Sequence, residues 1–328
     1  MELILATRDG REIENVPYDT DMEIGGTNTF EICVPRAAWA GDYKHDMLLY
    51  VLGTEYGGII GEIESRNEPE DVFCKGYTWR GLLQKKIIVP PAGEDYYTIS
   101  GDVNACIRQL VSTICADSLF RGTEETAGVD VSGYQFGRYT DLLTGIEKML
   151  GSVGYRIDIA YRQEGTGGYV EIAAVPIENY AAQIDLSEDD ELKISADDIR
   201  NGTNHLICLG QGELAQRTVL HLYADAEGNI SETQSMFGRD ELAEVFDYSS
   251  AEDIAELRRA GLERFEEVKS AKRFDAEAGR IEANLSIGDI ISGRDYTTGI
   301  NVVRPIERII FKITGEIESI EYRLEGET

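Results

Sequence analysis

The chain has 328 residues, of which 61 are acidic and 31 basic, so its formal net charge at pH 7 is −30. Hydrophobic residues make up 42% of it, as in ordinary globular proteins, and no apolar run has the length of a membrane span, which argues against stable membrane insertion. A surface of this charge repels the phosphate backbone, so sequence-specific nucleic-acid binding is not expected. The 61 acidic residues predict one of two things: an ordinary solvated protein surface, or a surface along which DNA slides without binding.

The first 94 residues have the pattern of a small β-barrel-like domain. Because the N-terminus lacks a basic lead and a cleavage region, it predicts a first strand rather than a signal peptide. A short turn is expected to pack against a hairpin through Trp79, Leu82 and Leu83. Pro90-Pro91 is expected to end the strand that follows. Runs of strand-forming residues predict strands over 2–7, 22–34, 47–52, 58–63, 72–77 and 86–89.

Residues 95–198 predict an α/β module. Asp102 can cap a helix whose apolar residues from Val103 to Ile114 share one face. A second helix from about Thr140 is expected to end at Gly151 and Gly154. Alternating residues over 155–161 and 170–174, joined by a glycine-rich turn, predict a hairpin beside these helices.

Residues 199–328 predict a second β-barrel-like domain with a helical insertion over 238–272. Its helix is expected over about 250–270, with Ser249 and Glu252 at capping-box spacing. Strands are expected over 205–210, 218–224, 280–285, 287–292, 300–303, 305–314 and 317–324. The fold class is therefore α+β and mainly β, with two small β-barrel-like domains, an α/β insertion module and a long helix near the C-terminal barrel.

Several glycines in the C-terminal third predict tight backbone turns rather than ligand sites. Gly288-Asp289 and the segment from Asp295 to Gly299 fit turns that enter or join strands. Gly210 and Gly212 fit a bulge between strands, because a phosphate loop would require a third glycine or a Gly-Lys-Ser/Thr ending.

Four segments in order resemble the tail-hub (baseplate-hub) proteins of long-tailed phages and prophages, which are related in fold to contractile-tail hubs. The first segment covers 57–91, the second 204–219, the third 285–300 and the fourth 305–309. The residues that carry the first three are Gly58, Trp79, Leu82, Leu83, Gly210, Gly212, Arg217, Gly288, Asp289, Arg294, Asp295 and Gly299.

The resemblance implies a structural protein that connects the tail tube to the tail tip and forms a channel for DNA. It implies a homotrimer in which two barrel-like domains per subunit make a pseudo-sixfold ring. The partners that it implies are the distal tail, tape-measure and tip proteins, and the location is the virion tail after synthesis in the bacterial cytoplasm. A reducing site of synthesis also agrees with five scattered cysteines that never have CxxC spacing.

No catalytic residue, cofactor site or metal site is predicted. The three histidines have no HExxH or paired spacing, which argues against zinc. Asp225 to Asn229 opens like a calcium loop, but position twelve is Met236, so a β-turn is expected. Because the last predicted strand lies close to Thr328, a peptidase or lysozyme-like extension, which some hubs of this kind carry, is not expected. Two alternatives stay open: a cell-wall-degrading or glycan-binding tail protein with a site among the many acids, and the hub of a contractile injection system.

Overall fold

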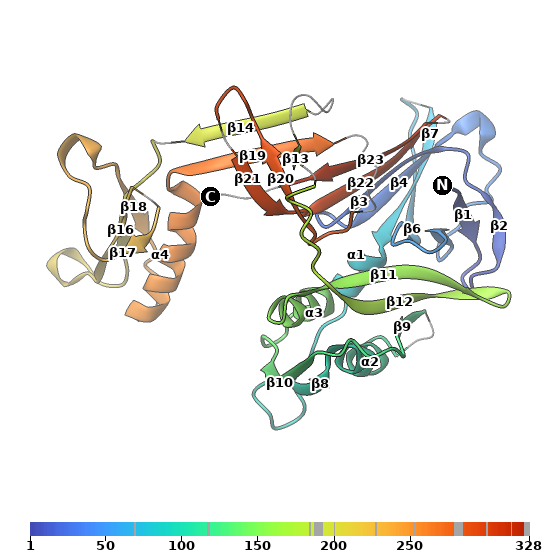
Figure 1. Cartoon of the computed structure of the whole chain (residues 1–328), viewed down its shortest axis with the longest axis horizontal. Helices are drawn as coiled ribbons and strands as arrows, with labels where there is room; N and C mark the ends of the chain where they lie inside the picture. The colour runs from blue at the N-terminus through green and yellow to red at the C-terminus, as the bar shows by residue number, and fades with distance from the viewer. Residues whose placement is uncertain are drawn as a thin grey trace. The chain divides into compact units, whose positions relative to one another are not determined.

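A computed structural model describes residues 1–328 except 69, 117–118, 184, 187–192, 200, 227, 252, 279–284, 300, 316 and 325–328. Strand accounts for 42% of the chain and helix for 18%, which confirms the predicted mainly β class. The described residues form two compact units (Figure 1). The first comprises 1–193, 276–293 and 303–324, and the second is formed mainly by 194–275 and 294–302.

The first unit is built around a curled sheet, half of a barrel, in which neighbouring strands run antiparallel. From one side to the other its strands follow the order β23, β22, β3, β4, β7, β6, β5, β1 and β2. Their bounds are β1 Leu3–Ala6, β2 Glu12–Asn15, β3 Asp19–Ile24, β4 Thr29–Pro35, β5 Leu48–Val51, β6 Gly57–Ser65, β7 Asp71–Thr78, β22 Arg308–Thr314 and β23 Ile317–Arg323. At the β23 side, Glu277 and Ala278 of β19 (Ala271–Ala278) pair with this sheet.

Alternation along β3 and β4 decides which face of the sheet is buried. Thr20, Met22 and Ile24 point into the core and the residues between them face outward, and β4 repeats the pattern. Each large apolar side chain buried in this way contributes about 1.5–3 kcal/mol relative to exposure. The opposite face is free to carry charge.

Two predicted strands of the N-terminal region are wrong in detail. The run 22–34 is two strands, because Gly25 and Asn28 adopt positive φ values of 96° and 55° and reverse the chain between them. Residues 86–89 form no regular strand, and Ile87 makes only an isolated bridge to Asp141. The short apolar element before them is helix α1 (Trp79–Gln84). A 3₁₀ turn covers Arg36–Ala38.

The α/β module has the predicted helices and hairpin. Its helices are α2 (Val103–Ile114), capped by the Asp102 carboxylate, and α3 (Leu142–Gly151). The hairpin pairs β11 (Tyr155–Glu164) with β12 (Gly167–Pro176), and β9 (Phe120–Gly122) joins it in parallel. A second small sheet pairs β8 (Thr98–Asp102) with β10 (Asp130–Gln135). Both helices lie beside the hairpin (Figure 1).

The module does not have a core of its own. One hydrophobic cluster joins residues of α2, α3, β11 and β12 to Tyr50, Trp79 and Leu83 of the preceding 94 residues. The closing strands also return to the first unit, since Ile309 of β22 lies opposite Ile24 of β3. The sequence predicts these strands in a separate C-terminal barrel. Their pairing with β3 could not be predicted, because residues nearly 300 positions apart leave no local pattern in the sequence. The domain boundaries 1–94, 95–198 and 199–328 stay a prediction. The two compact units of the structure have different boundaries.

The second unit has a four-stranded sheet covered on one face by a helix. Its strands are β15 (His205–Leu209), β16 (Val219–Ala224), β17 (Ile230–Ser231) and β18 (Ala243–Asp247). Leu257 and Phe265 of helix α4 (Ile254–Val268) pack with Leu206, Cys208 and Leu222. The helix was expected to begin near Ser249, but its cap is Asp253, whose carboxylate accepts from two backbone amides of the first turn. Glu252 lies outside the described residues.

The remaining strands and turns connect these parts. They are β13 (Asp185–Leu186), β14 (Lys193–Ile199), β20 (Ile290–Arg294) and β21 (Asn301–Pro305), with 3₁₀ turns at Leu214–Gln216 and Gly238–Asp240. Within the first unit, β13 runs parallel to β20. The predicted strand over 280–285 lies almost wholly outside the described residues.

Candidate functional site

Helix α1 is the point where the sheet and the module meet. Thr78 caps it by accepting from the Gly81 amide at 3.4 Å. Trp79 is fully buried and stacks 6.0 Å from Tyr161, with the Phe120 ring edge-on at 6.5 Å. Leu83 is also fully buried and Leu82 partly so. The structure therefore gives Trp79, Leu82 and Leu83 a packing role.

Gly58 lies in β6 under this helix, where a side chain has no room. A Cβ atom built there would lie 2.2 Å from the Tyr77 carbonyl oxygen and 2.7 Å from the Phe30 ring. Real Cβ atoms do not approach a backbone oxygen so closely, so a substitution would force β6 and β7 apart.

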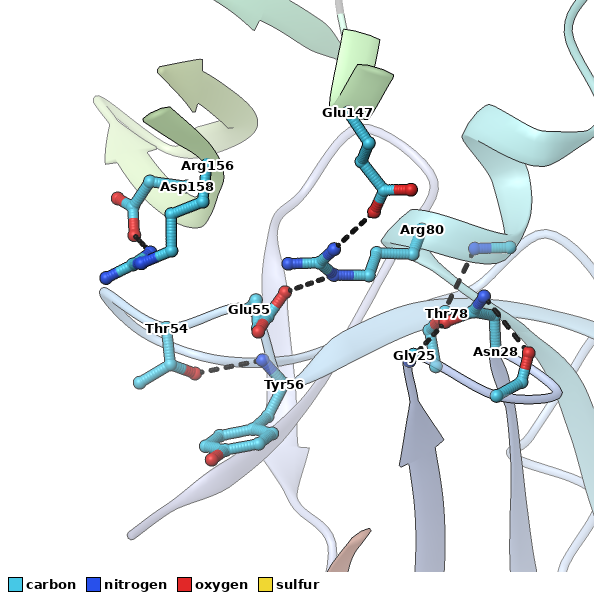
Figure 2. Close-up of polar contacts among 12 residues, drawn as sticks. Gly25, Asn28, Thr54, Glu55, Tyr56, Thr78, Arg80, Glu147, Arg156 and Asp158 are labelled. Carbon is cyan, nitrogen blue, oxygen red and sulfur yellow. Dashed lines mark hydrogen bonds and ion pairs between the residues drawn. The ribbon is translucent and has the colours of Figure 1, made fainter. Parts of the chain in front are cut away.

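A buried arginine next to Trp79 joins three elements (Figure 2). The Arg80 side chain is 2% exposed; its Nε donates to Glu55 Oε2 at 2.8 Å and its Nη1 to Glu147 Oε1 at 2.9 Å. Burial opposes the charge of Arg80, but Glu55 and Glu147 hold its pKa above the usual value. Burial raises the pKa of Glu147 against the effect of Arg80. The group ties α1 to the β5–β6 turn and to α3.

Sequence reasoning missed this cluster. Its two carboxylates lie 25 and 67 positions away from Arg80, and neither spacing corresponds to a helix or strand repeat. The one indication in the sequence is Arg80 itself. A charged side chain between Trp79 and Leu83 in an apolar turn requires a partner of opposite charge when it is buried.

Two further turns are fixed by buried side chains. Asn28 Oδ1 accepts from the Gly25 amide at 2.8 Å, and the Asn28 carbonyl accepts from the Thr78 amide at 2.9 Å, which sets the β3–β4 turn over α1 (Figure 2). Asp289 is 1% exposed and accepts from Arg156 Nε at 2.8 Å and from the Ser286 amide at 2.9 Å. Gly288 has φ 93°, so the predicted tight turn before β20 is present.

The other predicted residues lie in the second unit and also form turns. Asp295 is buried and accepts from the Thr298 amide at 2.6 Å, while its carbonyl accepts from the Gly299 amide at 2.9 Å. Arg294 precedes this turn and is exposed. Gly299 has φ 74°. This is the predicted hairpin turn.

Arg217 holds the loop between β15 and β16. Its Nε donates to the Gly210 carbonyl at 3.0 Å and its Nη2 reaches Asp247 of β18 at 2.5 Å. Gly212 has φ 103°. The segment is a loop with a 3₁₀ turn rather than the predicted bulge, because nine residues separate the two strands. The twelve predicted residues thus fall into two groups, one packed at α1 and one in turns and loops.

Two histidines that looked isolated in sequence lie together in the second unit. His205 Nε2 is 2.8 Å from His221 Nδ1, and His205 Nδ1 is 2.6 Å from Glu241 Oε1. Across the part of the chain that the structure describes, no group of three His, Cys, Asp or Glu side chains could hold a metal ion. The structure describes all five cysteines, and none of them is in a disulfide. The Asp225–Asn229 segment is a turn in which the Asn229 amide donates to the Asp225 carboxylate.

A groove of about 540 Å³ crosses the outer face of the sheet of the first unit. Its lining comes from β3, β4, β6, β7 and the β3–β4 turn, and includes the carboxylates of Asp21, Glu23, Glu31 and Glu62 with the single lysine Lys75. Tyr77, 42% exposed, stands at its wall. This volume lies within the range of about 300–1,000 Å³ that is usual for ligand sites. Sequence reasoning did not find it, since its residues come from four strands.

No family model matches the chain, and no curated protein matches it. Among the described residues, no helix is both long and apolar enough to cross a membrane.

Solved structures of phage tail proteins do match. The prophage MuSo2 43 kDa tail protein from Shewanella oneidensis is 12% identical with a TM-score of 0.54, covering 99% of this chain and 98% of that one. A chain of the phage P2 baseplate, in its activated conformation with Ca, is 9% identical with a TM-score of 0.51 and covers 99% and 98%. The prophage tail protein gp18 from Listeria monocytogenes is 12% identical with a TM-score of 0.50 and covers 99% and 94%. The predicted resemblance is therefore confirmed at the level of the fold, and the chain has the fold of phage tail and baseplate proteins.

Proposed function

We propose that this chain is a structural component of a phage-type tail, acting as the hub that connects the tail tube to the tip. The observation that carries the proposal is the extent of the structural match: it covers 99% of this chain and 98% of the matched chain for both a phage tail protein and a baseplate protein. A shared fold by itself does not specify a function. The sequence motifs in the same order along the chain add independent support.

The proposed hub is a homotrimer that surrounds a channel for DNA, and its partners are distal tail, tape-measure and tip proteins. The net charge of −30 supports the channel, because an acidic wall repels the phosphate backbone and lets DNA pass without adhering. Light scattering of the purified protein over a range of concentrations tests the oligomer. A mass three times that of one chain is expected at high concentration, since assembly depends on protein concentration. A monomer at every concentration would count against the trimer.

The proposed role is structural rather than enzymatic. The predicted residues support this, because each of them packs in the core or shapes a turn or loop of its own unit. A peptidoglycan zymogram provides the test, and no clearing is expected. Clearing by the wild-type protein that disappears in a Glu62→Gln variant would reverse the assignment in favour of a wall-degrading tail protein.

A further inference from the structure

Strand register sets a row of charges on the outer face of the sheet, and four of them, Asp21, Glu31, Lys75 and Glu62, line the groove. Lys312 of β22 lies opposite Asp21 of β3, Asp21 opposite Glu31 of β4, Glu31 opposite Lys75 of β7, and Lys75 opposite Glu62 of β6. Asp21 and Glu31 are therefore like charges directly across an antiparallel pair, an arrangement that destabilises a sheet.

The two lysines of this row are already engaged by other carboxylates. Lys75 Nζ lies 2.6 Å from Glu64 Oε2 and 3.4 Å from Glu31 Oε2, and Lys312 Nζ lies 3.0 Å from Glu321 Oε1. Within the described residues, Asp21 and Glu62 form no ion pair, although both line the groove. Partial burial, and then the nearby Glu321, Glu23 and Glu31, raise the pKa of Asp21 despite the proximity of Lys312. The folded protein therefore holds excess negative charge in a confined place.

The floor of the groove contains two glycines, Gly61 and Gly76. Gly61 and Gly76 leave the backbone bare, and the register shift between Ile60 and Glu62 marks a β-bulge beside them. A Cβ atom at Gly76 would lie 1.9 Å from the Ile59 carbonyl oxygen, so the close approach of β7 to β6 requires glycine at this position. Tyr77, 42% exposed, forms an aromatic wall of the groove, and Lys85 Nζ of this chain already lies 4.8 Å from the centroid of its ring.

We propose that this groove binds a lysine- or arginine-bearing segment of a different tail protein. Charge complementarity identifies the occupant: four carboxylates and one lysine line the groove, so cationic side chains that reach Asp21 and Glu62 meet carboxylates that form no ion pair among the described residues. Nucleic acid is repelled by the same carboxylates. The inference deepens the proposed function and rests on it only for the source of the segment.

The test is fluorescence anisotropy of a short labelled peptide of alternating lysine and serine, with a glutamate–serine peptide as the control. Wild-type protein is expected to bind only the lysine peptide. The double variant Asp21→Asn/Glu62→Gln, nearly isosteric with the wild type, is expected to lose about tenfold in affinity, as two surface ion pairs predict. The matched control Glu94→Gln/Glu125→Gln removes the same charge from exposed sites of the first unit and is expected to lose less than about twofold.

A third variant has an effect of the opposite sign. Lys75→Gln removes the cation that Glu31 and Glu64 now share, so it is expected to bind the lysine peptide more tightly than wild type. The groove would be ruled out as the binding site if the two double variants lost equal affinity for the lysine peptide. It would also be ruled out if Lys75→Gln bound the peptide no more tightly than wild type. Incorporation of Asp21→Asn/Glu62→Gln into tail particles is scored separately. A protein that joins tails but never binds the peptide would overturn this inference and leave the hub proposal intact.

Discussion

The first unit contains two groups of charged residues that differ in how their charges are balanced. At α1, Arg80 is buried and forms ion pairs with Glu55, which is 13% exposed, and with Glu147, which is 40% exposed. In the groove, Asp21 and Glu62 are near other carboxylates and form no ion pair within the described residues. A paired buried charge fixes the packing of the elements that it joins. An unpaired cluster on a surface costs stability and favours a partner of opposite charge.

The largest effect is expected from Arg80→Met. The substitution leaves Glu55, 13% exposed, and Glu147, 40% exposed, without their cation, which costs about 3 kcal/mol of unfolding free energy, the lower end of the range for a broken buried pair because water screens Glu147. Urea denaturation followed by circular dichroism measures it. The control is Arg8→Met, whose ion pair with Asp46 is 82% and 63% exposed and is expected to contribute less than about 1 kcal/mol. Equal losses in the two variants would show that the α1 cluster does not fix the packing of the sheet against the module.

A smaller loss is expected from Asp289→Asn. The amide keeps the shape but lacks the charge that holds Arg156, so about 2 kcal/mol should be lost, as for a hydrogen bond to a charged group. The same denaturation experiment provides the value. Stability within error of the Arg8→Met control would contradict the importance of this buried pair.

The groove variant Asp21→Asn should change stability in the opposite direction. Because it removes one of two like charges that face each other across β3 and β4, a gain of up to about 0.5 kcal/mol is expected. A clear loss of stability, measured as a lower urea midpoint with an unchanged slope, would mean that Asp21 is already balanced within the folded chain.

The smallest effect concerns the pH dependence of that gain. Burial raises the pKa of folded Asp21 above its ordinary value of 3.8. The folded protein therefore binds this proton more tightly than the unfolded chain, and the associated stability is lost as pH rises through the folded pKa. The gain from Asp21→Asn should be greatest at neutral pH and shrink as pH falls toward 3.8. Urea midpoints of both proteins at several pH values test this, and a gain that grows on acidification would contradict it.

Much of the local structure could be predicted from sequence. The Asp102 cap, the apolar face of α2, the glycine-rich turn of the β11–β12 hairpin and the turns at Gly288 and Gly299 depend on residues close together in the chain. The pairing of β22 with β3 could not be predicted, because the pleated pattern of a strand does not name its neighbour.

The candidate sites were harder to predict for the same reason. The α1 motif pointed to Trp79 and Leu83 as core residues, but Glu55 and Glu147 meet Arg80 only after the sheet and module pack together. The groove requires the register of four strands and the bulge at Ile60. With 61 acidic residues in the chain, composition alone could not single out Asp21 and Glu62.

Electron cryomicroscopy of tail particles from cells that encode this chain tests the central proposal most directly. Three copies in a closed ring on the tail axis, between the tube and the tip, are the expected result. Intact tails that lack this chain, or that carry it only as single copies away from the axis, would contradict a hub role.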